Sequence, residues 1–303
     1  SLLDVAGIAP GPWDYIDCCG VLHHLEDPDA GLTALTNVLA PDGGLGIMVY
    51  GTLGRTGVYH VQEMVSVLAP PGTSEDKERV ALTKRLVDSL PPTAWLSRNG
   101  LMRDHMEGGD TGFYDLFLHA RDRAYRVPEV IELVDAAKLR LVTFIEPYQY
   151  DPQRLVRDPR LKKVLAGLDS LEQAAFAELY LGNMKQHVFY AVRSENPVMP
   201  PLTDAPVTVP ALIGLTPEEV AKQMPAGGTI TVAMEGHKLD MMVPALARAI
   251  VALCDGQRDL VAIHAEIQEK RTDLDYGAFK RQFDQFYDVM NAINRMVLRL
   301  PVY

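Results

Sequence analysis

Two apolar runs separated by a helical pattern open the chain. Tyr15–Val21 is mostly apolar, which is typical of a strand buried on both faces of an open α/β sheet. Apolar residues then recur at helical spacing over Asp29–Leu39, and Pro41-Asp42-Gly43-Gly44 predicts a turn that ends this helix. Leu45–Tyr50 is the second run. The order strand, helix, strand predicts two neighbouring parallel strands joined by a right-handed crossover.

A second set of elements lies between residues 128 and 193. Pro128–Ala137 has the pattern of a helix with proline in its first turn, and Leu139–Ile145 has the pattern of a strand. Ser170–Met184 is a predicted helix and His187–Arg193 another strand. We expect these two strands to complete the same sheet, so that residues 1–195 form one α/β domain.

Residues 51–113 have a looser pattern and are interpreted as an insertion in this domain. Val61–Leu68 and Glu75–Leu90 are predicted helices, and Gly108–Gly112 is a predicted loop. At the other end of the domain, residues 196–210 contain five prolines and predict a linker.

The sequence pattern after the linker predicts mainly helices. Thr216-Pro217 predicts the start of a helix with Thr216 as its cap, and Thr229–Met234 predicts a short strand. Three helices are expected over Met242–Leu253, Leu260–Lys270 and Tyr276–Met296. Residues 211–303 are therefore expected to form a small helix-rich accessory domain, separable from the first.

Composition limits the classes of function. The chain of 303 residues has a formal net charge of -11, which argues against a general nucleic-acid-binding footprint. Its three cysteines do not make a disulfide framework, and no apolar stretch reaches the roughly 18 residues of a membrane span, so a cytoplasmic location without a membrane partner is expected. The histidines show no metal-ligand spacing with cysteines or carboxylates, so no metal site is predicted.

The opening block resembles a known family. Residues 13–28 include Asp17 and the run Val21-Leu22-His23-His24-Leu25, and Pro41-Asp42-Gly43-Gly44 follows. This block is similar to the fourth strand, fourth helix and fifth strand of class I S-adenosylmethionine (SAM)-dependent methyltransferases. The resemblance implies a Rossmann-like fold. In that family the glycine-rich cofactor loop lies well upstream, so we expect a truncated chain, with a partial class I sheet and an incomplete SAM site that binds SAM weakly.

The resemblance implies a role for the end of the first strand. In an open α/β sheet, ligands bind beyond the carboxyl ends of the strands. The residues that would border SAM are Cys19, Gly20, Val21, Leu22 and His24. The alternative interpretation makes the cysteines small core residues, Gly20 a packing requirement and His24 a structural hydrogen-bonding residue.

Residues for the methyl acceptor are expected after the second strand and after the insertion, which in this family covers the substrate. Tyr50, at the end of the second strand, is a candidate catalytic residue, and Arg55 and Tyr59 after it are candidate substrate-binding residues. His119 is a candidate base, because histidine exchanges protons near neutral pH, and Arg121 accompanies it. Bacterial methyltransferases carry stretches similar to residues 115–128. The alternatives are a solvated surface turn around Arg55 and a packed connector around His119.

Two functions remain open on the sequence. The first is SAM-dependent methyl transfer to an unidentified acceptor. The second is a non-catalytic scaffold or partner-binding protein that acts through the terminal domain. Separately, truncation is expected to leave Tyr15–Val21 as an edge of the sheet, which would pair with a second copy of the chain. Residues 253–263, around Asp255-Gly256-Gln257-Arg258, also resemble the signature of small winged-helix-like modules appended to enzymes.

Overall fold

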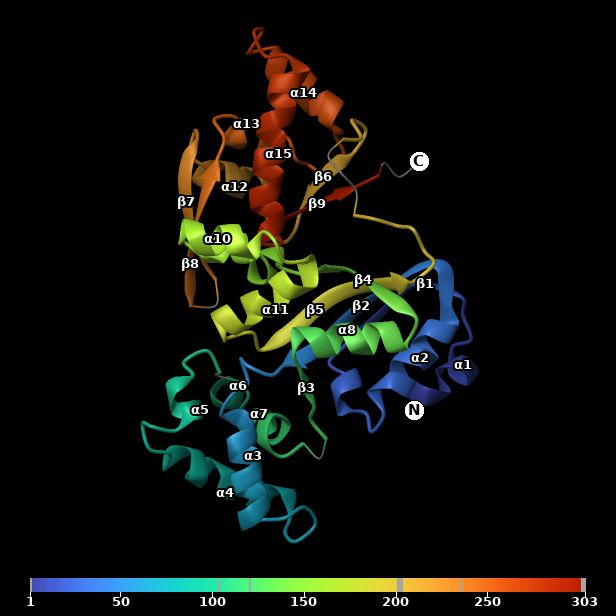
Figure 1. The fold of residues 1–303 in the computed structure, drawn as a ribbon, viewed down its shortest axis with the longest axis vertical. Helices are drawn as coiled ribbons and strands as arrows, with labels where there is room; N and C mark the ends of the chain where they lie inside the picture. Colours follow the sequence, from blue (N-terminus) through green and yellow to red (C-terminus); the bar gives the residue numbers. More distant parts are fainter. Residues whose placement is uncertain (1, 103, 120, 201–203, 235, 301–303) are drawn as a thin grey trace. The chain divides into compact units, whose positions relative to one another are not determined.

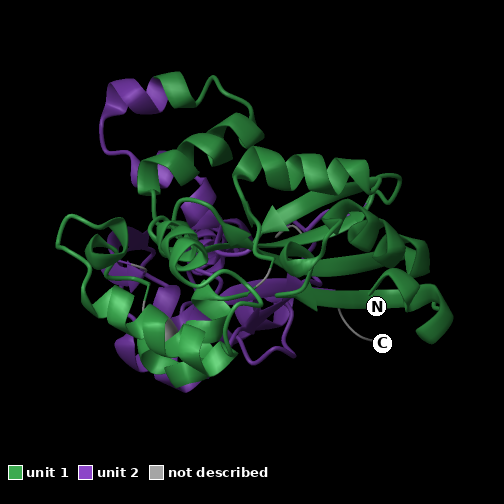
Figure 2. Ribbon diagram, turned by 90° about the horizontal axis from the view of Figure 1, so that it is seen from below, with its two compact units in different colours: residues 1–144, 164–197 green, residues 145–163, 198–303 purple. Residues whose placement is uncertain are grey.

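The computed structural model describes residues 2–102, 104–119, 121–200, 204–234 and 236–300. The chain divides into two compact units (Figure 2). Unit 1 comprises Ser1–Phe144 and Val164–Pro197, and unit 2 comprises Ile145–Lys163 and Val198–Tyr303.

Unit 1 is built on a mixed sheet in the order β1-β2-β5-β4. β1 (Trp13–Cys19) and β2 (Leu39–Gly51) pair in parallel, and β5 (Gln186–Arg193) runs antiparallel between β2 and β4 (Leu139–Phe144). The prediction that these four segments share one sheet is therefore confirmed. A short strand, β3 (Ala124–Tyr125), pairs with the end of β2.

Three helices form a layer along this sheet. They are α2 (Pro28–Val38), α8 (Val127–Ala136) and α11 (Ser170–Leu181), and α8 contacts both of the others (Figure 1). Asp27 caps α2 through the amide of Ala30, and Asp169 starts α11 with a capping box. The sheet supplies fully buried side chains such as Ile47 and Phe189 to the core. Sequence capping signals and apolar periodicity therefore define this layer.

β1 differs from the prediction in its burial. Of its residues only Cys18 is fully buried, while Trp13 and Tyr15 are 48% and 53% exposed. The prediction of a strand buried on both faces is wrong because the alternating residues Trp13, Tyr15, Asp17 and Cys19, which share one face, are all exposed. β1 is also an edge strand in the described sheet, as expected from the sequence.

The predicted turn at Pro41–Gly44 is extended backbone inside β2. The pairing register shifts between Trp13↔Leu39 and Tyr15↔Gly44, so the extra residues bulge from the ladder. Gly43 fits because a Cβ there would lie 2.8 Å from the carbonyl oxygen of Trp13. The Pro-Asp-Gly-Gly sequence thus permits a close backbone approach rather than a turn.

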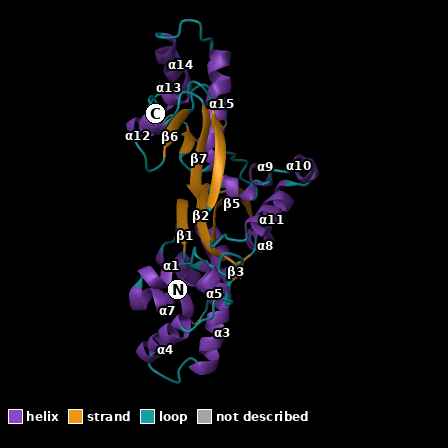
Figure 3. Ribbon diagram, turned by 90° about the vertical axis from the view of Figure 1, so that its left-hand side faces the viewer, coloured by secondary structure: helices purple, strands orange, loops and turns teal. Residues whose placement is uncertain are grey.

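The insertion in unit 1 is helical. It contains α3 (Val58–Leu68), α4 (Asp76–Asp88), α5 (Trp95–Arg98), α6 (Asp104–Glu107) and α7 (Gly109–Phe117) (Figure 3). Val61, Val80, Leu96 and Phe117 belong to a core of its own. The two predicted helices are confirmed, whereas the predicted loop Gly108–Gly112 is wrong, because Gly109 begins α7 and brings Phe113 and Phe117 into that core.

The first unit also has three short elements before α2. They are η1 (Leu2–Asp4), α1 (Val5–Ile8) and η2 (Leu22–His24). η2 follows β1 directly, and its Leu22 and His23 side chains are buried. The chain therefore turns inward immediately after the carboxyl end of β1.

Unit 2 combines helices with two small antiparallel sheets. Its strands are β6 (Val209–Leu212) with β9 (Met296–Arg299), and β7 (Gly228–Met234) with β8 (His237–Val243). Its helices after the proline-rich stretch are α12 (Pro217–Gln223), α13 (Ala247–Val251), α14 (Leu260–Gln268) and α15 (Tyr276–Ala292). Phe279, Phe283 and Phe286 of α15 lie at the centre of its core.

Two predicted helices are corrected in unit 2. Met242 and Val243 end β8, so the helix expected over Met242–Leu253 begins only at Ala247. α15 ends at Ala292, and Asn294 takes a positive φ of 52° before β9 begins at Met296. In both places residues with helical propensity belong to a strand instead: β8 pairs with the neighbouring β7, and β9 pairs with the distant β6.

The boundaries of the units differ from the predicted domains. Ile145–Lys163, assigned above to the first domain, lies in unit 2 as η3 (Pro147–Tyr150), α9 (Pro152–Leu155) and part of α10 (Pro159–Leu165). Tyr148 and Leu155 pack into the core of unit 2, which explains the assignment. Val209 and Pro210, within the predicted linker, belong to β6. None of the helices described is long and apolar enough to cross a bilayer.

Candidate functional site

The carboxyl ends of β1 and β2 lie side by side in unit 1, since Cys19 pairs with Met48. Gly20 follows β1 with a φ of 75°, and its amide donates to the carbonyl of Met48. A Cβ on Gly20 would meet only the end of the Met48 side chain, at 3.7 Å. The backbone at Gly20 is therefore open at the edge of the sheet where ligands bind in open α/β folds.

The predicted cofactor residues fall into two groups at this edge. Cys19 and Val21 are exposed, whereas the side chain of Leu22 is fully buried in the core and could offer only its backbone to a ligand. Burial, followed by the nearby Asp17, raises the pKa of Cys19 to about 11, so its thiol is neutral at physiological pH. Cys19, Gly20 and Val21 could thus form one wall of a cofactor site without chemistry of their own.

His23 is a buried neutral imidazole. It is 1% exposed, and its ring centroid lies 3.8 Å from that of Tyr50. Burial and then the neighbouring His24 lower the pKa of His23 to about 4. Neither ring nitrogen of His23 has a hydrogen-bond partner among the described residues. His23 therefore packs against the end of β2 as an uncharged ring.

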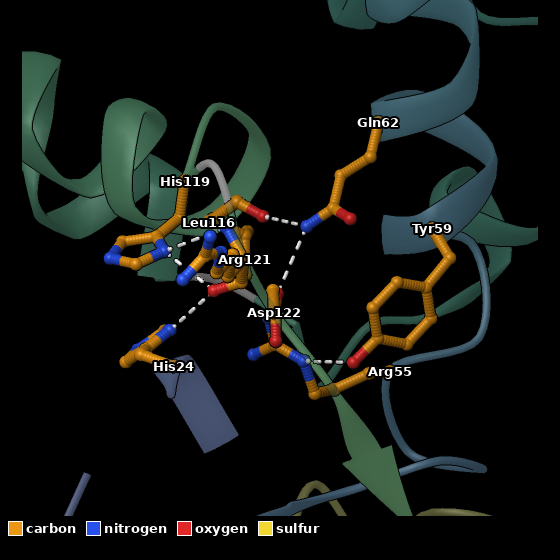
Figure 4. A network of polar contacts seen from close by, with 8 residues as sticks. All are labelled: His24, Arg55, Tyr59, Gln62, Leu116, His119, Arg121 and Asp122. Atoms are coloured by element: carbon orange, nitrogen blue, oxygen red, sulfur yellow. Dashed lines mark hydrogen bonds and ion pairs between the residues drawn. The ribbon is translucent and has the colours of Figure 1, made fainter. Parts of the chain in front are cut away.

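His24 and His119 meet although they are far apart in the sequence. Their ring centroids are 3.8 Å apart with planes inclined by 33°. The Nδ1 atoms of His24 and His119 lie 2.7 Å and 2.6 Å from the same carbonyl oxygen, that of Arg121 (Figure 4). The structure thus brings together three of the predicted site residues: His24, His119 and Arg121.

The guanidinium of Arg121 points to a different partner from its carbonyl. Nη2 of Arg121 lies 2.9 Å from Oε2 of Glu26, and both side chains are largely exposed. Such a surface ion pair contributes little to stability. Arg121 is thus placed at the predicted site, but the group that touches the histidines is its backbone.

Arg55, a predicted substrate ligand, is enclosed in a buried network. Its Nη2 lies 2.7 Å from Oδ2 of Asp122, and its Nε donates to the hydroxyl of Tyr59 at 3.1 Å. Its guanidinium carbon lies 3.7 Å from the centroid of the Tyr50 ring, a cation–π contact. Burial alone would lower the pKa of Arg55, but Asp122 and Tyr59 outweigh it and raise the pKa. Arg55 is therefore engaged inside the protein in this structure, with its charge balanced by Asp122.

Two further predicted residues are held by this network. Burial raises the pKa of Tyr59 to about 12, although Arg55 acts in the opposite direction, so Tyr59 is a neutral phenol. Tyr50 lies with one ring contact to His23 and another to the guanidinium of Arg55. Tyr50 therefore joins the sheet to the insertion through its ring.

Sequence reasoning missed Gln62 and Asp122. Nε2 of Gln62 donates both to Oδ2 of Asp122 and to the carbonyl of Leu116, each at 3.0 Å. Asp122 lies inside the polar stretch that the sequence singled out, beside Arg121. Gln62 lies on the predicted helix α3, and no sequence signal distinguishes it from an ordinary exposed glutamine.

A wide groove runs along the same helix. It has a volume of about 900 Å³ and is lined by Tyr59, His60, Gln62, Glu63, Met64, Ser66 and Val67. Tyr59 and Gln62 belong both to this groove and to the buried network. The groove is therefore a place where a molecule could lie against α3 and reach the network through Tyr59 and Gln62.

Comparisons with known proteins agree with the fold. No family model matches the sequence. An uncharacterized protein of Synechococcus sp. is 32% identical over 199 residues, which is 65% of this chain and 48% of that protein. The ubiquinone biosynthesis O-methyltransferase of Xanthomonas euvesicatoria is 29% identical over 113 residues, 36% of this chain and 43% of the enzyme. The chain thus spans about half the length of the curated relatives it matches.

Two solved structures share the fold over nearly the whole chain. PKMT2 from Rickettsia typhi matches with a TM-score of 0.63 and 16% identity, over 98% of this chain and 60% of PKMT2. PKMT2 in complex with AdoHcy, the product of SAM, matches with the same TM-score and 15% identity, over 99% of this chain and 61% of that one. The mixed α/β architecture is therefore a methyltransferase-like fold.

Proposed function

We propose that this chain carries the acceptor side of a SAM-dependent methyltransferase, acting on an acceptor that is not yet identified. The observation that carries the proposal is the edge of the sheet where β1 and β2 end. At this edge the backbone of Gly20 is open, and His24, four residues later, contacts His119. The fold is shared with a structure that contains AdoHcy. Open sheets of this kind bind ligands at that edge.

The residues present fit one wall of a SAM site. The cofactor would be bordered by Cys19, Gly20 and Val21. Their backbone lies at or just beyond the end of β1, and the side chains of Cys19 and Val21 are exposed. When bound, SAM supplies an electrophilic methyl group on a sulfonium. The chain's own residues orient the acceptor, exclude water and accept a proton, and much of the rate of such a reaction comes from positioning.

Binding of AdoHcy tests the cofactor half of the proposal. Isothermal titration calorimetry would be performed on this chain and on the full product of its gene. We expect AdoHcy to bind the full product, and Gly20→Ala to weaken that binding at least tenfold. Gly72→Ala is the matched control, because Gly72 also has a positive φ, of 79°, and a Cβ there meets nothing within 4 Å. The proposal would be withdrawn if neither protein bound AdoHcy.

Methyl transfer itself is tested with labelled SAM. The protein would be incubated with SAM carrying a tritiated methyl group and a bacterial extract divided into small molecules and macromolecules. Label in either fraction would support transfer and assign the class of acceptor by size. AdoHcy binding without any transferred label would favour a non-catalytic protein.

A second candidate function is binding of a partner at the edge of the sheet. It is favoured by the exposure of Trp13 and Tyr15 on β1, an edge strand in the described sheet. Exposed apolar strand edges pair readily with other chains. A second copy of this chain is the partner proposed here, and its test is given in the Discussion.

A further inference from the structure

One carbonyl oxygen fixes two imidazoles at the candidate site. The carbonyl of Arg121 lies 2.7 Å from Nδ1 of His24 and 2.6 Å from Nδ1 of His119. A carbonyl oxygen can only accept hydrogen bonds, so each Nδ1 must carry the proton. The amide of Arg121 also lies 3.3 Å from Nδ1 of His119, a contact that would need an unprotonated Nδ1, but the carbonyl contact of 2.6 Å is the shorter of the two and favours a protonated Nδ1. Both rings therefore present a bare Nε2.

We propose that His24 and His119 together act as the base that removes a proton from the molecule that receives the methyl group. The substrate class is then a nucleophile that must lose a proton, namely an amine or a hydroxyl group. This inference rests on the proposed function. A thioether or an ionised carboxylate would need no such base.

The surroundings of the pair suit this role. Both side chains are partly exposed, and neither Nε2 has a hydrogen-bond partner in the described part of the chain. A site that takes one proton and returns it to water can act in repeated turnovers.

The proposed methyl transfer balances in bonds, protons and electrons. The acceptor's N–H or O–H bond breaks, and its proton moves to one Nε2 of the pair. The electron pair stays on the acceptor atom, which forms the new bond to the methyl carbon. The C–S bond breaks with its electrons remaining on sulfur, giving AdoHcy, and the imidazolium releases its proton to water.

Gln62 is the positioning residue for this pair. The side-chain amide of Gln62 holds the segment that carries His119 on both sides. It donates to the carbonyl of Leu116, before His119, and to the carboxylate of Asp122, after it. Asp122 in turn is fixed by Arg55, and both side chains of that ion pair are almost fully buried. The carbonyl that sets both tautomers belongs to the residue next to Asp122. The buried network therefore acts through the backbone of Arg121.

Tautomers can be measured without cofactor or acceptor. Protein labelled with ¹⁵N-histidine would be recorded in long-range ¹H–¹⁵N correlation spectra across a pH series. We expect Nδ1–H with bare Nε2 for both neutral rings, and protonation of one ring to shift the resonances of the other. Assignments come from His24→Asn and His119→Asn, because asparagine keeps a donor near the Nδ1 position. A predominant Nε2–H tautomer in either ring would overturn the proposal.

The positioning role has its own measurement. Gln62→Met removes both hydrogen bonds at similar side-chain length, and Glu63→Met, at the next position in the same groove, is the matched control. In the Gln62 variant we expect mixed tautomers for His119, while the control retains the parent spectrum. Equal spectra for the two variants would refute the role of Gln62.

Transfer assays separate this inference from the proposed function. With an extract fraction that accepts label, His119→Asn and His24→Asn should lower the rate at least tenfold, and His237→Gln, on β8 of unit 2, should not. Label transfer that survives both asparagine variants would refute the paired base while methyl transfer stands. The expected tautomers without any label transfer would refute the proposed function alone.

Discussion

Glu178 and His187 face each other inside unit 1, with Oε1 of the carboxylate 3.6 Å from Nε2 of the imidazole and both side chains fully buried. The other carboxylate oxygen, Oε2, lies 3.0 Å from Nε of Arg126 and accepts from the amide of Val127, also at 3.0 Å. His187 lies on β5, while Arg126 and Val127 start α8, so this carboxylate joins the layer of helices to the sheet.

Glu178→Gln should therefore destabilise unit 1. A glutamine keeps one oxygen for Arg126 and Val127, but it removes the charge opposite Arg126, and its amide group replaces the oxygen that faces His187. An unsatisfied buried donor costs about 1–3 kcal/mol. Guanidinium unfolding at pH 7 measures the change, and Glu132→Gln, exposed on α8, is the control. Burial would raise the pKa of Glu178, but His187 and Val127 outweigh it and lower the pKa. The parent should thus lose this contribution as the pH falls below the ordinary glutamate pKa of about 4.3, and the variant should not.

His23 should make the fold sensitive to mild acid. Its pKa falls from 6.5 to about 4 because burial favours the neutral ring. Between these values the unfolded chain takes up a proton that the folded chain does not, so the free energy of unfolding decreases as the pH falls, by up to about 3 kcal/mol. His23→Phe keeps the ring against Tyr50 and should flatten this slope. Unfolding curves from pH 7 to 4.5 measure it, and an unchanged slope would contradict the assignment.

Lys138 marks a position where glycine is preferred. It follows α8 with a φ of 57°, and its amide donates to the carbonyl of Asp135. Non-glycine residues in this left-handed region carry a strain on the order of 1 kcal/mol. Lys138→Gly should therefore raise the free energy of unfolding by about 1 kcal/mol, whereas Lys138→Ala should not. Equal stability of the two variants would mean that the strain is absent.

The edge of the sheet predicts self-association. If a second copy pairs with β1, Tyr15→Lys should shift the protein toward monomer, because a charge on an edge strand disfavours pairing. Tyr190→Lys is the control, since Tyr190 is 42% exposed on β5, in the middle of the sheet. Sedimentation velocity at several concentrations measures both. A parent that remains monomeric throughout would dismiss the edge-paired dimer.

Local patterns explain how much of the fold the sequence could predict. The four long strands of unit 1 and helices α2, α8 and α11 were predictable because apolar runs, prolines and capping residues mark their limits. β8 was missed although its pattern was visible, since Leu239, Met241 and Val243 are buried and alternate with exposed neighbours. Period-two alternation over His237–Val243 should have outweighed the helical propensity of the methionines.

The candidate site was only partly predictable for a physical reason. The resemblance pointed to the stretches around His24 and His119, because each lies in a recognisable polar segment. The contact between them depends on how the insertion packs on the ends of the strands. The pairing of Gln62 with Asp122, and the burial of Arg55, arise from the same packing and have no local signal. Sequence reasoning consequently predicted Arg55 as a ligand of the acceptor, with a solvated surface turn as the alternative, and overlooked Gln62.

The pairing of β3 with β2 has a consequence for how this protein can change over time. Tyr50 pairs with Ala124 and Gly51 with Tyr125, so the chain leaves the sheet for the insertion and returns to it at neighbouring positions. The ion pair between Arg55, just after β2, and Asp122, just before β3, holds these outgoing and returning segments together. Residues 52–123 are thus an insertion whose two ends are held close together at the sheet. Replacing this insertion with one of different shape would alter which molecules fit the groove, while the register of the sheet stays the same. New methyl acceptors could then be acquired without a change in the fold of the domain.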